Sequence, residues 1–275
     1  MASRTLRPGD YATYAVLGLG AILMLLPFVW MVSTSLKTGG ATFVTPPQLI
    51  PASPTTINYE KAFGAVPMGQ FLVNSVFVSV TSTVLMVLTC AMAGYAFARI
   101  KFPGRDIIFY AYLATLMIPQ QVTLVPLFVL MTWLDWGNTY QALILPSSFG
   151  AFGTFLLRQF FQQLPREVEE AAFMDGAGYV RIFFTIGLQL ARPALATLAV
   201  FSFMASWNSF LWPLIITSNQ AMMTLPVGLS FLSGRYTTDW NVVMAGAVIG
   251  TVPIIAVYVF AQKYIIQGLA TTGLK

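Results

Sequence analysis

The chain has 275 residues, of which 57% are hydrophobic and only 8% are charged, and its mean hydropathy is +0.76. An ordinary soluble domain carries about 25% charged residues, so this composition excludes a soluble globular fold. The net charge of +5 would suggest nucleic acid for a soluble protein, but here the charges must first be assigned to connections between apolar segments. We expect membrane lipid around this chain and no nucleic-acid partner.

Six apolar stretches are each long enough to cross a bilayer, which requires about 20 residues of helix. They cover residues 11–36, 71–98, 107–134, 140–161, 193–217 and 242–262. The first stretch follows Arg4 and Arg7, but its apolar run is longer than that of a signal peptide, and no small-residue cleavage site comes after it. We therefore predict an all-α membrane protein with about six transmembrane helices, the first of which is not cleaved.

The distribution of basic residues predicts how these helices are oriented. If the N-terminus is cytoplasmic, eleven of the 14 Lys and Arg residues fall on cytoplasmic segments, and only Lys37, Lys61 and Arg235 fall on outer ones. This asymmetry follows the positive-inside rule, so both termini are expected in the cytoplasm. Only the outer segment 37–70 and the inner segment 162–192 are long, and we predict a single transmembrane domain over residues 1–275.

Residue types that the chain lacks exclude several kinds of chemistry. The chain has no His and a single cysteine, Cys90, so we expect no disulfide within it and no metal site. No Gly-Lys pair occurs, which rules out a phosphate-binding loop of the GxxxxGK[ST] type. Without a polar catalytic constellation at the edge of a stretch, we expect no catalytic residues and no cofactor bound by this chain.

Prolines predict two irregular regions. The outer segment 37–70 contains five prolines and cannot be a regular helix, so we expect an irregular loop, with a partner contact there as an open alternative. In the third stretch, Pro119 and Pro126 bracket Gln120, Gln121 and Thr123 at a depth where backbone groups need partners. Such an interruption either lines a cavity or forms a simple kink packed against neighbouring helices.

The inner loop, residues 163–192, concentrates four of the nine acidic residues: Glu167, Glu169, Glu170 and Asp175. A short surface helix is expected here, because Pro165 suits the first helical position, the glutamates favour the positive end of the helix dipole, and Gly176 can end the helix. Ala171 and Ala172 would leave one face nearly flat, with the acids and Arg166 in water. Two interpretations are open: a docking surface for another protein, or a solvated helix whose charges keep it out of the bilayer.

The residue order in this loop resembles the signature loop of permeases of binding-protein-dependent ABC importers. Glu170, Ala171 and Ala172 are followed by Gly176 and, after nine more residues, by Ile186 and Leu188. The whole chain is similar to the carbohydrate-uptake branch related to maltose and arabinose-oligomer permeases. Matching pieces occur in order along the chain: Asn58-Tyr59, Gly94 to Arg99, Phe102 to Arg105, Trp207-Asn208, Trp212 to Leu214, Thr224 to Leu229, Gln262 to Tyr264 and Gly268.

The resemblance implies a type I ABC importer permease in the plasma membrane of a bacterium or archaeon. In that family the loop is a coupling helix seated on a cytoplasmic ATPase, which implies coupling roles for Glu170, Ala171, Ala172, Asp175 and Gly176. The implied partners are a second permease subunit, two copies of the ATPase that binds ATP and Mg, and an extracytoplasmic solute-binding protein. The cargo would be a carbohydrate or related solute, with glycerophosphate compounds as a further option, moved inward by alternating access.

The sequence departs from the family pattern at two places. Gln189 stands where the family commonly has Pro, which bears on how the chain returns to the membrane after the loop. The C-terminal residues Gly273, Leu274 and Lys275 differ from the usual tail, which bears on contacts of the tail with the ATPase.

A path for a sugar would need amides and hydroxyls for hydrogen bonds and aromatic faces for stacking, with little charge. The candidates are Asn208, Trp207, Ser209, Trp212, Asn74, Gln120 and Gln121, with Asn208 first among them. Interfacial Trp residues and Asn or Ser bonded between helices are common in membrane bundles, so a purely structural role is open for each. The alternative function is an ion-coupled transporter that needs no ATPase, but no Asp or Glu lies inside a predicted stretch to carry a proton.

Overall fold

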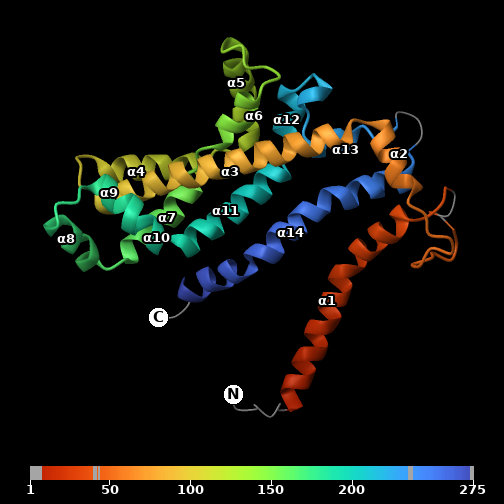
Figure 1. Cartoon of the computed structure of the whole chain (residues 1–275), viewed down its shortest axis with the longest axis horizontal. Coiled ribbons are helices and arrows are strands. Elements are labelled where there is room, and N and C mark those ends of the chain that lie inside the picture. The colour runs from red at the N-terminus through yellow and green to blue at the C-terminus, as the bar shows by residue number, and fades with distance from the viewer. Residues whose placement is uncertain (1–7, 40–41, 43, 235–237, 273–275) are drawn as a thin grey trace. The chain divides into compact units, whose positions relative to one another are not determined.

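The computed structural model describes residues 8–39, 42, 44–234 and 238–272 and is drawn in Figure 1. Every regular element within these ranges is a helix, and no strand is present there. Four of the basic residues used to predict the orientation, Arg4, Arg7, Arg235 and Lys275, lie outside the described residues, as does the C-terminal end 273–275.

Three helices are long and apolar enough to cross a membrane: α1 (Pro8–Ser35), α3 (Met68–Arg99) and α14 (Trp240–Thr272). They agree with the first, second and last predicted stretches. Three further candidates are helix pairs that are bent at a short break, so the described chain contains three to six spans by length and composition. The predicted number of about six corresponds to counting each bent pair as one span.

The third predicted stretch, residues 107–134, is interrupted. It consists of α4 (Arg105–Ala114), the 3-10 helix η1 (Thr115–Met117) and α5 (Gln120–Trp133), with a bend of 102° between the two parts. Pro119 precedes α5 in an extended conformation, as expected because proline lacks an N–H and disfavours a helical residue before it. The interruption predicted from Pro119 is confirmed, and it is much larger than a simple kink.

The fourth and fifth predicted stretches are also broken. The fourth comprises α6 (Tyr140–Ile144), the 3-10 helix η2 (Leu145–Ser147) and α7 (Ala151–Gln163), with a bend of 44°. The bounds 193–217 predicted for the fifth are wrong, because α11 (Arg192–Trp207) ends at Trp207 and α12 (Leu211–Ile216) begins after a turn. Pro213 fits the first turn of a new helix, whereas inside a continuous helix it would clash with the carbonyl four residues earlier.

The chain groups into two compact units, Met1–Pro67 with Leu229–Thr251, and Met68–Gly228 with Val252–Lys275. In the first unit, the outer segment contains α2 (Ile57–Ala65), so the prediction of no regular helix there is wrong for this part, which lies between Pro54 and Pro67 and contains no proline. The Nδ2 atom of Asn58 in α2 donates to the carbonyl oxygens of Ser35 and Lys37 at 2.8 and 2.7 Å. The outer segment is therefore tied back to the end of α1.

The central helix of the second unit is α3, with α4, α7 and α11 packed alongside it (Figure 1). Close approach depends on two glycines. A Cβ atom at Gly94 would lie 3.0 Å from the backbone nitrogen of Arg158, and one at Gly153 would lie 2.8 Å from the Sγ atom of Cys90. Small residues at such contacts let membrane helices pack backbone to backbone.

Two buried apolar clusters lie at different levels of α3. One surrounds Cys90 and Tyr95 and includes side chains of α7 and α11. The other surrounds Val78 and includes side chains of α5, α6 and α12, which meet near the opposite part of α3 (Figure 1). The long helix α3 therefore connects two separately packed regions of this unit.

Short helices complete the second unit. The inner loop contains α8 (Arg166–Met174), α9 (Tyr179–Ile182), the π-helix η3 (Phe183–Gly187) and α10 (Leu188–Leu190), which joins α11 through a bend of 79°. The segment after α12 contains the 3-10 helix η4 (Gln220–Met222) and α13 (Leu225–Ser230), whose last residues belong to the first unit.

Candidate functional site

The surface helix predicted in the inner loop is α8. Pro165 is the residue just before the first helical position rather than the first helical residue itself. Gly176 has φ +80°, and its N–H donates to the carbonyl of Phe173 at 3.0 Å. The N–H of Ala177 donates to the carbonyl of Ala172 at 2.9 Å, which completes a Schellman motif. The predicted helix end at Gly176 is confirmed.

The predicted coupling residues of α8 differ in exposure. Glu170, Ala171, Asp175 and Gly176 are exposed, whereas Ala172 is half-buried against the apolar cluster around Cys90 and Tyr95. Ala171 therefore lies on the surface and Ala172 packs toward the core, so the two alanines do not form one flat exposed face.

The outward face of α8 also includes residues that sequence reasoning did not select. Glu170, Ala171 and Met174 follow Glu167 by three, four and seven residues and so lie on the same side of the helix as Glu167. Met174 is 88% exposed, which is unusual for a large apolar side chain. This outer face, residues 167, 170, 171 and 174, combines two acids with a small and a flexible apolar side chain.

Glu169 does not lie in water as predicted. Its residue is only 8% exposed, and Oε1 is 3.0 Å from the Nε atom of Arg99 at the end of α3. The helical period places Glu169 on the side of α8 that faces the bundle, opposite the outer face, and burial of its charge requires an ionic partner. From a sequence alone, nothing distinguishes this glutamate from its neighbours Glu167 and Glu170.

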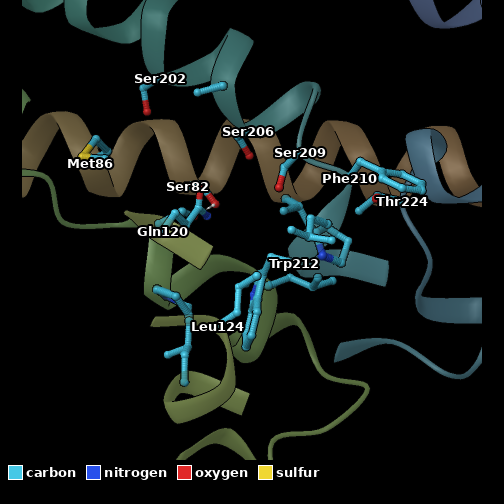
Figure 2. A pocket seen from close by; sticks show the side chains of 18 of the residues that line it. Ser82, Met86, Gln120, Leu124, Ser202, Ser206, Ser209, Phe210, Trp212 and Thr224 are labelled. Atoms are coloured by element: carbon cyan, nitrogen blue, oxygen red, sulfur yellow. Dashed lines mark hydrogen bonds between the residues drawn. The ribbon is translucent and has the colours of Figure 1, made fainter. Parts of the chain in front are cut away.

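A cavity of about 480 Å³ lies in the second unit, at the level where α3, α5 and α12 meet (Figure 2). Its polar lining includes Gln120 and Thr123 from α5 and Trp212 from α12. Figure 2 shows the hydroxyl groups of Ser202, Ser206 and Ser209 directed toward the side on which Gln120 and Trp212 lie. The break at Pro119 is what brings the first turn of α5 to this cavity.

The cavity contains three of the seven residues predicted for a substrate path, Gln120, Ser209 and Trp212. The hydroxyl of Thr123 donates to the carbonyl of Gln120 at 2.9 Å, and the Nε1 atom of Trp212 donates to the carbonyl of Ala142 at 2.8 Å. The indole N–H of Trp212 is thus already satisfied, and the residue is 7% exposed and packed in the cluster around Val78, so only part of its ring borders the cavity.

The other four predicted residues are not among the cavity lining. Asn74 is fully buried, and its Nδ2 atom donates to carbonyls in the 221–223 segment at 2.8 and 2.9 Å. Trp207 is buried and stacks on Phe203 with ring centroids 5.7 Å apart, while Gln121 is exposed. Asn208 is exposed at the end of α11, and its Nδ2 atom donates to the carbonyl of Met204 at 2.8 Å. The structure favours packing or capping roles for Asn74, Trp207 and Asn208.

Sequence reasoning selected Ser209 but missed the other serines of the cavity. Ser202 and Ser206 lie four residues apart on one side of α11, and Ser209 follows three residues later in the turn after the helix. Ser82 on α3 and Ser147 in η2 also line the cavity, and the hydroxyl of Ser147 donates to that of Ser82 at 3.2 Å. The helical spacing of Ser202, Ser206 and Ser209 was a signal in the sequence that could have identified this side.

No charged side chain is among the residues that line the cavity. Its polar groups are hydroxyls, one amide and one indole, alternating with apolar residues such as Val78 and Leu124. Within the described ranges, no group of three or more His, Cys, Asp or Glu residues is arranged to hold a metal ion. This chemistry suits hydrogen bonding and stacking with a polar solute rather than a reaction.

A helical bundle with interrupted spans, an exposed inner-loop helix and an uncharged cavity defines a membrane transport subunit. Residues 86–271 match the family described as "Binding-protein-dependent transport system inner membrane component". The chain belongs to this family and is a multi-pass permease subunit, as its sequence resemblance implied.

Individual relatives agree with this assignment over nearly the whole chain. The arabinooligosaccharides transport system permease protein AraQ of Halalkalibacterium halodurans is 36% identical over 96% of this chain and 94% of its own length. The sulfoquinovosyl glycerol transport system permease protein SmoH of Agrobacterium fabrum is 36% identical, covering 91% and 89%. In fold, the chain resembles the crystal structure of a bacterial ABC transporter involved in the import of alginate, with a TM-score of 0.85, 24% identity and coverage of 96% and 99%.

Proposed function

We propose that this permease subunit pairs with a second permease, two copies of a cytoplasmic ATPase and an extracytoplasmic solute-binding protein to import a carbohydrate by alternating access. ATP and Mg would be bound by the ATPase, which supplies the free energy, while this chain contributes the path and the mechanical connection. Both termini and the inner loop would lie in the cytoplasm, as the positive-inside rule predicts. The similarity to permeases for arabino-oligosaccharides and sulfoquinovosyl glycerol supports the carbohydrate class.

The observation that carries this proposal is the outer face of α8. The Schellman motif satisfies carbonyls in the last turn of α8 and gives the helix a defined end, and its exposed Ala171 allows a partner to approach closely. Glu167 and Glu170 would meet basic groups of the ATPase, and Met174 would fill an apolar groove, because its unbranched side chain adapts to irregular surfaces. Closure of the ATPase pair on ATP would then move α8 and change which side of the membrane the cavity faces.

The cavity provides part of the path for the solute. Sugar hydroxyls can exchange hydrogen bonds with Gln120, Ser206 and Ser209, and the faces of Phe210 and Trp212 can stack on sugar rings. Weak and distributed contacts of this kind favour passage, since a transported solute must leave as well as bind. The second permease would complete the cavity.

Gly176 provides the test of the coupling role. A β-branched residue strains the positive φ of Gly176, which costs about 1–2 kcal/mol, so Gly176→Val should distort the end of α8. Gly178→Val is the matched control: Gly178 has an ordinary φ of −83°, and a Cβ atom would have open space at either glycine.

The measurements are co-purification of the ATPase with the assembled importer and ATP hydrolysis stimulated by the loaded binding protein. Gly176→Val should reduce both while the chain still inserts into the membrane, and Gly178→Val should reduce neither. Normal coupling in Gly176→Val would refute docking through α8. Solute uptake by proteoliposomes that contain only this chain, driven by an ion gradient, would instead support the alternative of an ion-coupled transporter.

Binding measurements on the cognate solute-binding protein would identify the substrate class. Arabino-oligosaccharides and sulfoquinovosyl glycerol are suitable first probes, because relatives of this chain are named for them. Failure of every carbohydrate to bind would contradict the proposed cargo without affecting the assignment of the chain to its family.

A further inference from the structure

One guanidinium group joins three helices at the inner-loop end of the second unit. Arg99, the last residue of α3, places Nε 3.0 Å from Oε1 of Glu169 in the first turn of α8. Its Nη2 atom donates to the carbonyl of Leu164, the C-cap of α7, at 2.7 Å. The same side chain therefore contacts α8 and the end of α7 at once.

This contact is shielded from water. The side chain of Arg99 is 4% exposed and that of Glu169 is 11% exposed. Ion pairs in such surroundings resist screening by salt, and removing one partner leaves an uncompensated buried charge. By contrast, the pair between Lys61 and Asp239 is about half exposed, and pairs of that kind contribute little.

Apolar packing surrounds the ion pair and fixes its position. Tyr95, one turn before Arg99 on α3, contacts Phe161 of α7 and Phe183 of the π-helix, with ring centroids 5.3 Å apart in each case. Ala172 and Ala177 pack against the same cluster from α8 and the turn that ends it. The inner side of α8 is thus held against α3 by one charged contact within an apolar surround.

The helix α3 runs from this contact to the cavity. Ser82, which lines the cavity, lies seventeen residues before Arg99 in the same uninterrupted helix, a distance of roughly 25 Å at 1.5 Å per residue. Val78 and Met86 of α3 also line the cavity. A displacement of the Arg99 end therefore reaches the cavity wall through a single rigid element.

We infer that Arg99 and Glu169 are positioning residues that carry the movement of α8 to α3, so that a force on the inner loop changes the accessibility of the cavity. This inference rests on the proposed coupling role of α8. The outer face of α8 receives the force from the ATPase, and Glu169 on the opposite side of α8 transmits that force to Arg99 of α3. A charge is suited to this task because the guanidinium is held at two separate points, by the ion pair of Nε with Glu169 and by the hydrogen bond from Nη2 to the Leu164 carbonyl.

The test uses a reporter that does not depend on knowing the solute. Ser206→Cys places a thiol in the cavity, whereas the native Cys90 is buried, so a membrane-impermeant maleimide added outside should label position 206 alone. The assembled importer in proteoliposomes is labelled without nucleotide and with ATP plus vanadate, and the ATP-dependent change in labelling rate measures transmission. ATP hydrolysis and co-purification of the ATPase are measured on the same samples.

In this background, Glu169→Gln should reduce the ATP-dependent change in labelling about tenfold, within the usual range of coupling between sites. The ATPase should still co-purify and hydrolyse ATP, because the outer face of α8 is intact. Glu60→Gln is the matched control, since it makes the same change at an exposed position of α2, outside the surface assigned to docking, and it should leave the labelling change as it was. The exchanged pair Arg99→Glu with Glu169→Arg should restore part of the change that each single variant loses.

Three results would overturn the inference: an unchanged labelling response in Glu169→Gln, an equal loss in Glu60→Gln, or an exchanged pair no better than the single variants. Loss of the ATPase from the Glu169→Gln complex would also overturn it, because the pair would then act in assembly rather than transmission. If Gly176→Val couples normally, the docking role of α8 itself fails. If Gly176→Val is uncoupled but Glu169→Gln is not, only the transmission role fails.

Discussion

The close approach of α3 and α7 at Gly94 predicts that a single added methyl group destabilises the protein. A Cβ atom there would lie 3.0 Å from the backbone nitrogen of Arg158 and 3.0 Å from the Cβ atom of Leu157. Comfortable contacts are about 3.5–4.0 Å, so both groups would have to retreat by roughly half an ångström. They belong to the middle of α7, so the helix itself must shift rather than a flexible side-chain end.

The expected change in the free energy of unfolding of Gly94→Ala is the balance of an unfavourable and a favourable effect. Overpacking of this kind costs about 1–3 kcal/mol, and replacing glycine by alanine inside a helix returns up to about 1 kcal/mol. Gly94→Ala should therefore lower the free energy of unfolding by about 1–2 kcal/mol. Gly69→Ala, in the first turn of the same helix with open space around the new Cβ atom, should not lower it and should raise it by at most about 1 kcal/mol.

Cys90 supplies the assay. It is the only cysteine of the chain, it is 1% exposed, and it belongs to the apolar cluster between α3, α7 and α11. Its reaction with a fluorogenic maleimide during heating of the purified complex, resolved on a gel for this chain, reports when that cluster opens. Reaction of Gly94→Ala at the wild-type temperature, or an equal shift in Gly69→Ala, would refute the argument that α3 and α7 are in backbone contact there.

Four further predictions concern the sites and the orientation. Ser206→Cys should react with a water-soluble maleimide and Trp207→Cys should not, because only position 206 lines the cavity; equal labelling rates would contradict this geometry. Asn74→Ala should lower the free energy of unfolding by about 1–3 kcal/mol, since its amide bonds two carbonyls of the 221–223 segment, and unchanged Cys90 protection would argue against those bonds. Met174→Asp should reduce the ATPase recovered with the complex several-fold, and full recovery would place docking elsewhere. A fluorescent protein that matures only in the cytoplasm, fused after the last residue, should fluoresce, and a dark but membrane-inserted fusion would reverse the predicted orientation.

The long spans follow directly from the sequence, because burial in hydrocarbon demands about 20 apolar residues in a helix. That requirement predicted α1, α3 and the apolar part of α14 with nearly correct ends. It failed for residues 193–217, where the composition stays apolar although the helix ends at Trp207. Hydropathy measures preference for the membrane and does not depend on backbone conformation, so the turn at residues 208–210 leaves the stretch apolar.

The candidate site residues also divide into those that the sequence predicted and those that the tertiary structure decided. Gly176 was identified from its sequence position because only glycine adopts a positive φ at low cost, and the structure confirms the helix end there. Of the residues chosen for a sugar path, Gln120, Ser209 and Trp212 line the cavity, whereas Asn74 is used inside the bundle. The sequence does not distinguish an amide side chain that binds a ligand from one that bonds a neighbouring segment. Either partner satisfies the same donor and acceptor groups of the amide.

By itself, the sequence determined that the chain is a helical membrane protein, that it contains no GxxxxGK[ST] loop, and that the loop at residues 163–192 carries the family signature. These properties depend on composition and on local residue order, which no folding partner alters. Only the tertiary structure decided that Glu169 turns inward to Arg99 while Glu167 and Glu170 stay outside, and that serines of α3 and α11 face one cavity. Such pairings join residues far apart in the chain, and which side of a helix becomes buried depends on the helices that pack against it.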